Sequence, residues 1–202
     1  NSIPSSINKV NVTMGFPLKS SQYFSFFETL LVLNNGASHS KDSQLRFYFK
    51  HVLSLLNHEV CIKHFAEESK GLIAYIQEHN KINLTFKEIE AIFPTISKLF
   101  AAKSSVEEQL NFYLEMIDEF LDGSISILDK SILFHLHSAI KNTIKSVASY
   151  DIQLDIEVFT RLFKQMGASL KVPFTGEPLE GIQVMGVLET RNLDFQNTFI
   201  DR

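Results

Sequence analysis

Residues 181–195 have the sequence Gly181-Ile182-Gln183-Val184-Met185-Gly186-Val187-Leu188-Glu189-Thr190-Arg191-Asn192-Leu193-Asp194-Phe195. The run from Ile182 to Leu188 has the length and apolar composition of a buried strand. A polar turn follows, and apolar residues return at Phe195 and at 198–200. In an open α/β sheet, ligands bind at the edge where the strands end. The polar residues of this turn are therefore the first site candidates, and an ordinary surface turn is the alternative.

The composition predicts a globular protein. The chain has 202 residues, of which 45% are hydrophobic and 21% charged, which is enough for one good core or two small ones. No run approaches the roughly eighteen apolar residues of a membrane helix, so we expect no membrane contact. Residues 1–6 lack the basic and apolar regions of a signal peptide. A single cysteine, Cys61, cannot form an internal disulfide, and we expect it to be buried in a protein of the cytoplasm.

The chain neither begins with methionine nor continues far beyond its last apolar run. It stops two residues after Ile200, within what the pattern predicts to be a sheet. We therefore expect an excised domain of a longer protein.

The two ends of the chain carry the predicted strands. Residues 9–14 alternate apolar and polar side chains, and Gly15-Phe16-Pro17 ends this strand. Ser20 or Ser21 then caps a helix that residues 34–36 stop. The simplest sheet pairs residues 10–14 with 182–188.

Residues 44–167 have helical periodicity almost throughout. The predicted helices cover residues 45–56, 67–79, 85–93, 105–123, 128–147 and 155–167, with capping boxes at Thr85/Glu88 and Ser105/Glu108 and a cap at Asp155. The predicted fold class is thus α/β with a large all-α insertion, predominantly helical. The predicted domains are 1–36 plus 170–202, and an inserted helical subdomain at 37–169. Strands within the helical block, or terminal strands that lie far apart, would contradict this model.

Motifs for catalysis are absent from the sequence. There is no G-x-x-x-x-G-K-[ST] phosphate loop and no G-x-G-x-x-G fingerprint. The pairs His51/His58 and His135/His137 lack the i, i+4 spacing of a helical zinc site. Asp151 and Asp155 are interpreted as turn and cap. We assign no catalytic residue, metal ligand or cofactor to this chain.

Charge is distributed unevenly, although the net charge is only −4. Residues 104–129 hold seven acids and no base, and residues 130–172 hold six bases and three acids. Solvated faces are the ordinary explanation. The functional alternative is a basic face against phosphates, formed by Lys141, Lys145, Arg161, Lys164 and Lys171.

The two ends together resemble a known family. Residues 181–200, with Gly186, Glu189-Thr190-Arg191 and Leu193-Asp194-Phe195, are similar to the fifth helicase motif of the RecB/AddB-type helicase–exonucleases of superfamily I. Many of these carry a PD-(D/E)XK nuclease domain, and some are inactivated helicases. Residues 10–18 resemble the strand, glycine turn and helix after the fourth motif, and residues 53–58 are also similar to the group.

The resemblance implies that the ends form part of a second RecA-like domain, with a partial RecA-like sheet, and that the helices form its inserted subdomain. It implies a DNA repair and recombination protein that contacts single-stranded DNA and couples a motor to partner domains or to a helicase/nuclease partner subunit. The parent would be an ATP-dependent hydrolase using ATP and Mg, whose phosphate loop belongs to a first domain.

The fifth motif of active relatives has a K-G-L-E-F core that contacts DNA and senses the nucleotide. Arg191 keeps its positive charge and Asp194 its carboxylate, whereas Asn192 replaces the glycine and Leu188 stands where histidine is common. The implied DNA-binding residues are Arg191, Asn192, Thr190, Thr13 and Gly15. Nucleotide sensing by Asp194 is in doubt, because these departures also fit a degenerate motor.

Two other classes remain open. One is a structural scaffold built on an inactivated helicase fold, which the acidic residues of the 105–123 helix favour (Glu107, Glu108, Glu115, Asp118, Glu119 and Asp122). The other is an unrelated helical binding module, for which the end motifs arise by chance.

We predict that the isolated chain shows no ATPase and no nuclease activity with magnesium or manganese, because no residue set in it binds a nucleoside triphosphate or an activating metal. Assays of a pure sample check this. Turnover that a point substitution in this chain abolishes would contradict it.

Overall fold

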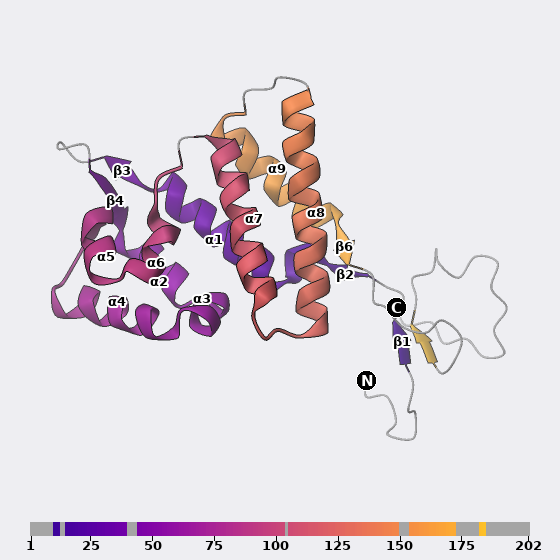
Figure 1. Ribbon diagram of the computed structural model, residues 1–202, viewed down its shortest axis with the longest axis horizontal. Coiled ribbons are helices and arrows are strands. Elements are labelled where there is room, and N and C mark those ends of the chain that lie inside the picture. The colour runs from indigo at the N-terminus through magenta and orange to yellow at the C-terminus, as the bar shows by residue number, and fades with distance from the viewer. Residues whose placement is uncertain are drawn as a thin grey trace, which may run out of the picture. The chain divides into compact units, whose positions relative to one another are not determined.

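The computed structural model describes residues 10–12, 15–39, 44–103, 105–149, 154–172 and 182–184. The chain divides into two compact units, one formed by Asn1–Phe16 with Lys171–Arg202 and the other by Pro17–Leu170. The first boundary differs from the predicted one at residue 36, because helix α1 (Gln22–Asn35) packs among the helices of the second unit (Figure 1). The described chain is predominantly helical with small sheets, as predicted.

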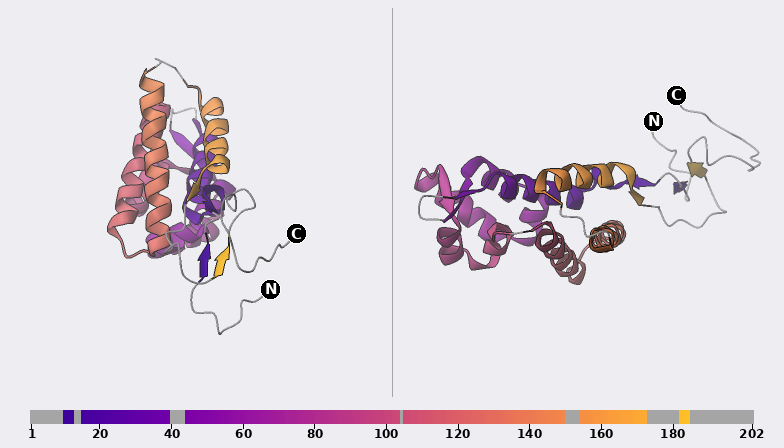
Figure 2. Two further views of the ribbon diagram at one scale, coloured as in Figure 1. Left: turned by 90° about the vertical axis from the view of Figure 1, so that its right-hand side faces the viewer. Right: turned by 90° about the horizontal axis from the view of Figure 1, so that it is seen from above.

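The terminal unit contains the first strand of the chain paired with a strand near its end. Strand β1 (Val10–Val12) pairs in parallel with β7 (Ile182–Val184), with Val10 opposite Ile182 and Val12 opposite Val184. Figure 2 shows the two arrows pointing the same way. The predicted pairing of these segments is confirmed, whereas the second predicted strand, at 195–200, lies outside the described residues. Strands β2 (Phe16–Pro17) and β6 (Lys171–Val172) form a further short pair.

The second unit, which we call the helical unit, holds the remaining elements. They are η1 (Leu18–Ser20), α1, β3 (Ser38–His39), β4 (Leu45–Tyr48), α2 (Phe49–Leu56), α3 (Glu59–His64), α4 (Ala66–Glu78), β5 (Asn83–Thr85), α5 (Phe86–Ile92), α6 (Pro94–Ser97), η2 (Lys98–Phe100), α7 (Val106–Asp122), α8 (Ile127–Ser149) and α9 (Ile156–Ser169). In Figure 2, seen from above, α1 and α9 lie in one layer and α7 and α8 in another.

Helix α1 lies at the centre of the helical unit. Its buried side chains are Tyr23, Phe24, Phe26, Phe27, Leu30, Leu31 and Leu33. The Phe24 ring stacks on Phe163 of α9, with centroids 4.8 Å apart and planes 6° from parallel. On another side, Tyr113 of α7 packs on Phe27 and donates a hydrogen bond of 3.1 Å to its carbonyl. Burying each large apolar side chain contributes roughly 1.5–3 kcal/mol, so α1 supplies much of the core.

The predicted caps are observed. Ser21 caps α1 and accepts from the Phe24 amide, Ser105 caps α7, and Asp155 caps α9 through the amides of Glu157 and Val158. Thr85 forms a complete capping box with Glu88 at the start of α5. The pattern of a short polar side chain just before an apolar run therefore predicted the starts of these helices correctly.

Residues 44–167 were expected to be helical almost throughout, with no strands among the helices, and the absence of strands is wrong. Strand β4 pairs in an antiparallel manner with β3 and β5, with Phe47 opposite Leu84. The predicted helix at 45–56 begins only at Phe49. Residues 45–48 form strand β4 instead, and Phe47 is the one residue of that strand that is fully buried. Four residues with mixed apolar spacing fit both a strand and a helical turn, and pairing with β5 decides between them.

Helix α9 continues past Gly167, where the sequence predicted its end. A Cβ at Gly167 would lie 2.1 Å from the Phe24 ring, so glycine is required for close packing of α9 on α1 rather than for a helix stop. The helix ends two residues later, at Ser169.

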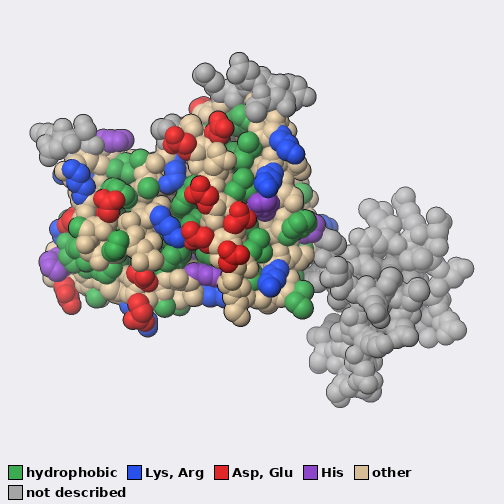
Figure 3. All heavy atoms as spheres, in the orientation of Figure 1, with side chains coloured by type: hydrophobic (Ala, Val, Ile, Leu, Met, Phe, Trp, Pro, Cys, Tyr) green, Lys and Arg blue, Asp and Glu red, His purple; other side chains and the backbone are tan. Residues whose placement is uncertain are grey.

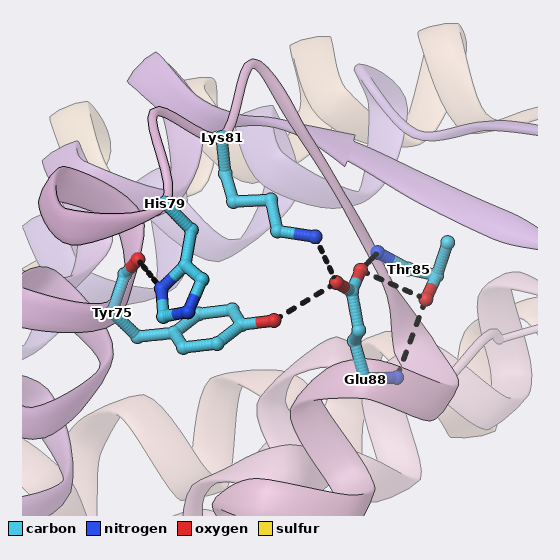
Figure 4. A network of polar contacts seen from close by, with 5 residues as sticks. All are labelled: Tyr75, His79, Lys81, Thr85 and Glu88. Carbon is cyan, nitrogen blue, oxygen red and sulfur yellow. Dashed lines mark hydrogen bonds and ion pairs between the residues drawn. The ribbon is translucent and has the colours of Figure 1, made fainter.

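A network of hydrogen bonds around Glu88 joins α4, β5 and α5 (Figure 4). The Glu88 carboxylate accepts from Tyr75 Oη at 3.0 Å, from the Thr85 amide at 3.1 Å and from the Lys81 ammonium. Burial opposes ionisation of Glu88, but the bonds from Lys81, Thr85 and Tyr75 prevail and lower its pKa to about 2. A carboxylate held ionised by so many donors is a structural brace and not a general base.

Replacing Glu88 with glutamine is expected to lower the free energy of unfolding at pH 7 by roughly 1–3 kcal/mol, because the charge-assisted bonds are lost. The folded pKa of Glu88 lies below its ordinary value of 4.5, so its contribution is complete above pH 4.5 and is lost as the pH falls toward 2. Urea denaturation between pH 2 and 7 measures this. Glu90→Gln, an exposed change in the same helix, is the control, and equal pH profiles for both variants would contradict the brace.

Candidate functional site

The edge of the terminal sheet is the site that the sequence predicts. Because β1 and β7 are parallel, the residues that follow them begin at the same edge of the sheet. Gly15 is half-buried, and a Cβ there would lie 2.8 Å from Cβ of Lys171 and 3.2 Å from the Val172 carbonyl oxygen. Close packing against β6 therefore accounts for this glycine without a ligand.

The other predicted residues of this site lie outside the described part of the chain. These are Thr13, Thr190, Arg191, Asn192 and Asp194. Their assignment to DNA contact and nucleotide sensing stays a prediction.

The predicted basic face is divided over three elements. Lys141 and Lys145 are exposed on α8, Arg161 and Lys164 are exposed on α9, and Lys171 is exposed in β6. Lys171 belongs to the terminal unit and the other four residues to the helical unit. No single surface formed by all five residues is therefore described.

Two residues on α8 were missed by the sequence analysis. Lys130 is exposed, and Phe134 is 63% exposed although it is a large aromatic residue. Their signal in the sequence was the spacing of Lys130, Phe134 and Lys141 by four and seven residues, which places them on one helical stripe.

A polar pocket of about 510 Å³ lies where α1 and α3 begin. Its lining is Lys19, Ser20, Ser21, Gln22, Ser25, Asn57, His58 and Glu59. Ser25 Oγ lies 3.1 Å from Nε2 of His58, the spacing of a nucleophile and its base.

The hydrogen bonds of His58 argue against a catalytic pair. Its Nδ1 accepts from the Val60 amide at 3.2 Å, so in the neutral ring the proton is on Nε2, which donates to Ser25. A nitrogen that already carries a proton cannot take one from Ser25. Burial lowers the pKa of His58, although the charge of Glu59 opposes this, so the neutral form is favoured. His58 is the cap of α3 and not a base.

The acidic residues predicted for one helix lie along the outer side of α7 (Figure 3). Glu107, Glu108, Glu115, Asp118, Glu119 and Asp122 are all exposed. Lys98 pairs with Glu119, and His137 Nε2 lies 3.6 Å from Asp118. We call this set the acidic stripe.

A groove of about 400 Å³ adjoins the acidic stripe, with Phe112 and Met116 in its lining. Lys103 lies over the Phe112 ring, 4.0 Å from its centroid, and donates to the Ala101 carbonyl at 2.8 Å. Burial lowers the pKa of Lys103, while Glu115 and Glu108 oppose the shift.

Among the described residues, no group of three or more His, Cys, Asp or Glu side chains is placed to hold a metal ion. Cys61 is fully buried, as expected, and burial raises its pKa to about 12. Within the described ranges, no helix combines the length and the apolarity that crossing a bilayer requires.

Comparisons with known proteins give no relative. No family model matches the chain, and neither a curated protein nor a solved structure is significantly similar to it.

We expect nitrogen-correlated NMR of the folded chain to show His58 with a bare Nδ1 and a pKa below 6.5. Because the folded pKa is lowered, the unfolded state binds the proton more readily, and stability falls as the pH drops below 6.5. The variant His58→Asn keeps a side chain that can cap the helix but has no titrating group. Part of the dependence of stability on pH should therefore disappear in this variant. A proton on Nδ1 at neutral pH would instead restore Ser25 and His58 as a possible catalytic pair.

Proposed function

We propose that this chain is a non-catalytic part of a helicase/exonuclease-like protein of DNA repair and recombination. It contributes contacts to single-stranded DNA and couples the motor to partner domains. The observation that carries the proposal is the parallel pairing of β1 with β7 across the whole helical unit. Parallel neighbours need a crossover connection, and here the crossover contains a compact unit of its own.

The sheet within the helical unit counts against both the insertion model and the family resemblance, because each expected no strand inside the helical block. Its strands β3, β4 and β5 pair with one another, so it is a local part of that unit. The proposal therefore depends on the terminal strands and on the motif residues that follow them.

The proposed DNA contact is centred on Arg191. The terminal β7 strand ends at Val184, and Arg191 follows in the resembling motif after the apolar run. A guanidinium there would hold a backbone phosphate, with Asn192 or Thr190 beside it. The ATP and magnesium of the parent would be bound by another domain.

A scaffold for a partner protein is the second candidate function. The acidic stripe favours it, because six carboxylates on one helix repel a phosphate backbone and suit a basic protein surface.

Replacing Arg191 with alanine should weaken binding of single-stranded DNA by the full-length protein about equally for all sequences. The slope of log affinity against log salt should fall by about one, and Arg191→Lys should have a milder effect. Fluorescence anisotropy over a range of salt concentrations measures both, and the melting temperature should stay nearly unchanged.

The exposed Arg46 of β4 provides a control with the same loss of charge, Arg46→Ala. If Arg191→Ala lowers the melting temperature and leaves the salt slope unaltered, Arg191 braces its turn, and the scaffold becomes the better proposal.

A further inference from the structure

The outer side of α8 combines basic residues with an exposed aromatic ring. Lys130, Phe134, His137, Lys141 and Lys145 follow one another in steps of four, three, four and four residues. At 3.6 residues per turn, these steps keep all five on one stripe, roughly 22 Å long from Lys130 to Lys145. We call it the basic-aromatic stripe.

Phe134 lies largely outside the core of the helical unit. Its side chain is 63% exposed, while Leu133 and Leu136 beside it are fully buried in the core. Its one described ring contact is with the neighbouring His135, edge to face at 5.9 Å. A large exposed ring between basic residues is typical of a platform on which a base stacks.

Two charges of the stripe, those of Lys130 and Lys141, are available on the solvent side. Lys130 and Lys141 are exposed, and neither has an acidic partner within ion-pair distance among the described residues. His137, in contrast, faces Asp118 of the acidic stripe on the adjacent α7. Figure 3 shows basic side chains along α8 beside acidic ones over α7.

We propose that the basic-aromatic stripe binds single-stranded DNA, with phosphates at Lys130 and Lys141 and one base stacked on Phe134. This deepens the proposed function and rests on it, but it places a contact in the helical unit, independent of Arg191. The neighbouring acidic stripe confines the strand to the outer side of α8. An apolar protein partner is the competing occupant, and Phe134→Leu separates the two, because leucine keeps apolar area for a protein contact but cannot stack on a base.

The chain contains no tryptophan, so Phe134→Trp introduces a single fluorescent reporter. The titration uses an oligothymidylate of about 20 nucleotides at roughly 0.01 M ionic strength, where the Debye length is about 30 Å. Binding of the DNA should quench the fluorescence of this tryptophan, and the variant should bind DNA with the same affinity as the unmodified chain. Ile82→Trp is the matched control, since Ile82 is 64% exposed and lies outside α8. Its fluorescence should not change.

Loss of the ring or of the charges should weaken binding in different ways. Phe134→Ala and Phe134→Leu should each lower affinity at least about fivefold, because leucine restores apolar area but not stacking. The double change Lys130→Ala with Lys141→Ala should reduce the salt slope by about 1.4. Lys50→Ala with Lys87→Ala removes the same charge from exposed positions outside α8 and should have a much smaller effect.

The outcomes distinguish this inference from the proposed function. If Phe134→Trp is not quenched and the α8 variants bind DNA normally while Arg191→Ala does not, the stripe is no DNA site but the proposed function stands. Absence of any binding by the chain overturns the stripe. Absence of an Arg191 effect on DNA binding in the full-length protein overturns the proposed contact at Arg191.

Discussion

Burial of helix α1 on almost every side is the constraint on which the helical unit depends. Its aromatic side chains contact α9 through Phe163, α7 through Tyr113 and Phe120, and the α3 cap through His58. One helix thus fixes the positions of several others. Truncating a buried phenylalanine typically costs about 3–5 kcal/mol, so loss of one such ring would remove a large fraction of the stability of a domain.

Helix starts and helix periods were predictable from the sequence, because capping and amphipathic spacing are local. Ser21, Thr85, Ser105 and Asp155 cap helices as expected. The errors occurred where a distant partner decides the structure. Residues 45–48 form a strand because β5, almost 40 residues later, pairs with them, and no local pattern contains that information. Gly167 lies inside α9 because the Phe24 ring occupies the place of a side chain there.

The same distinction applies to the candidate sites. Phe134 was missed because an aromatic residue at helical spacing ordinarily belongs to the core, and only the packing of α8 shows which side faces solvent. Ser25 and His58 are 33 residues apart, so their contact could not be foreseen, and the cap that excludes catalysis depends on the backbone at Val60. Lys171 belongs to the terminal unit, whereas the basic residues of α8 and α9 belong to the helical unit. A count of charges along the sequence cannot show this separation, because it depends on the pairing of strands at the two ends of the chain.

Opposite charges on α7 and α8 make a DNA contact and a protein contact compatible. The two helices pack side by side, and His137 Nε2 of α8 lies 3.6 Å from Asp118 of α7. Full neutralisation across this contact would leave neither surface charged enough to attract a partner. Because most of these side chains instead face solvent, each helix keeps its own field, although salt screens it beyond about 10 Å at 0.1 M ionic strength. The basic residues of α8 would then attract a phosphate backbone, while the acidic residues of α7 would attract a basic protein surface. The helical unit could therefore bind DNA and a protein at the same time.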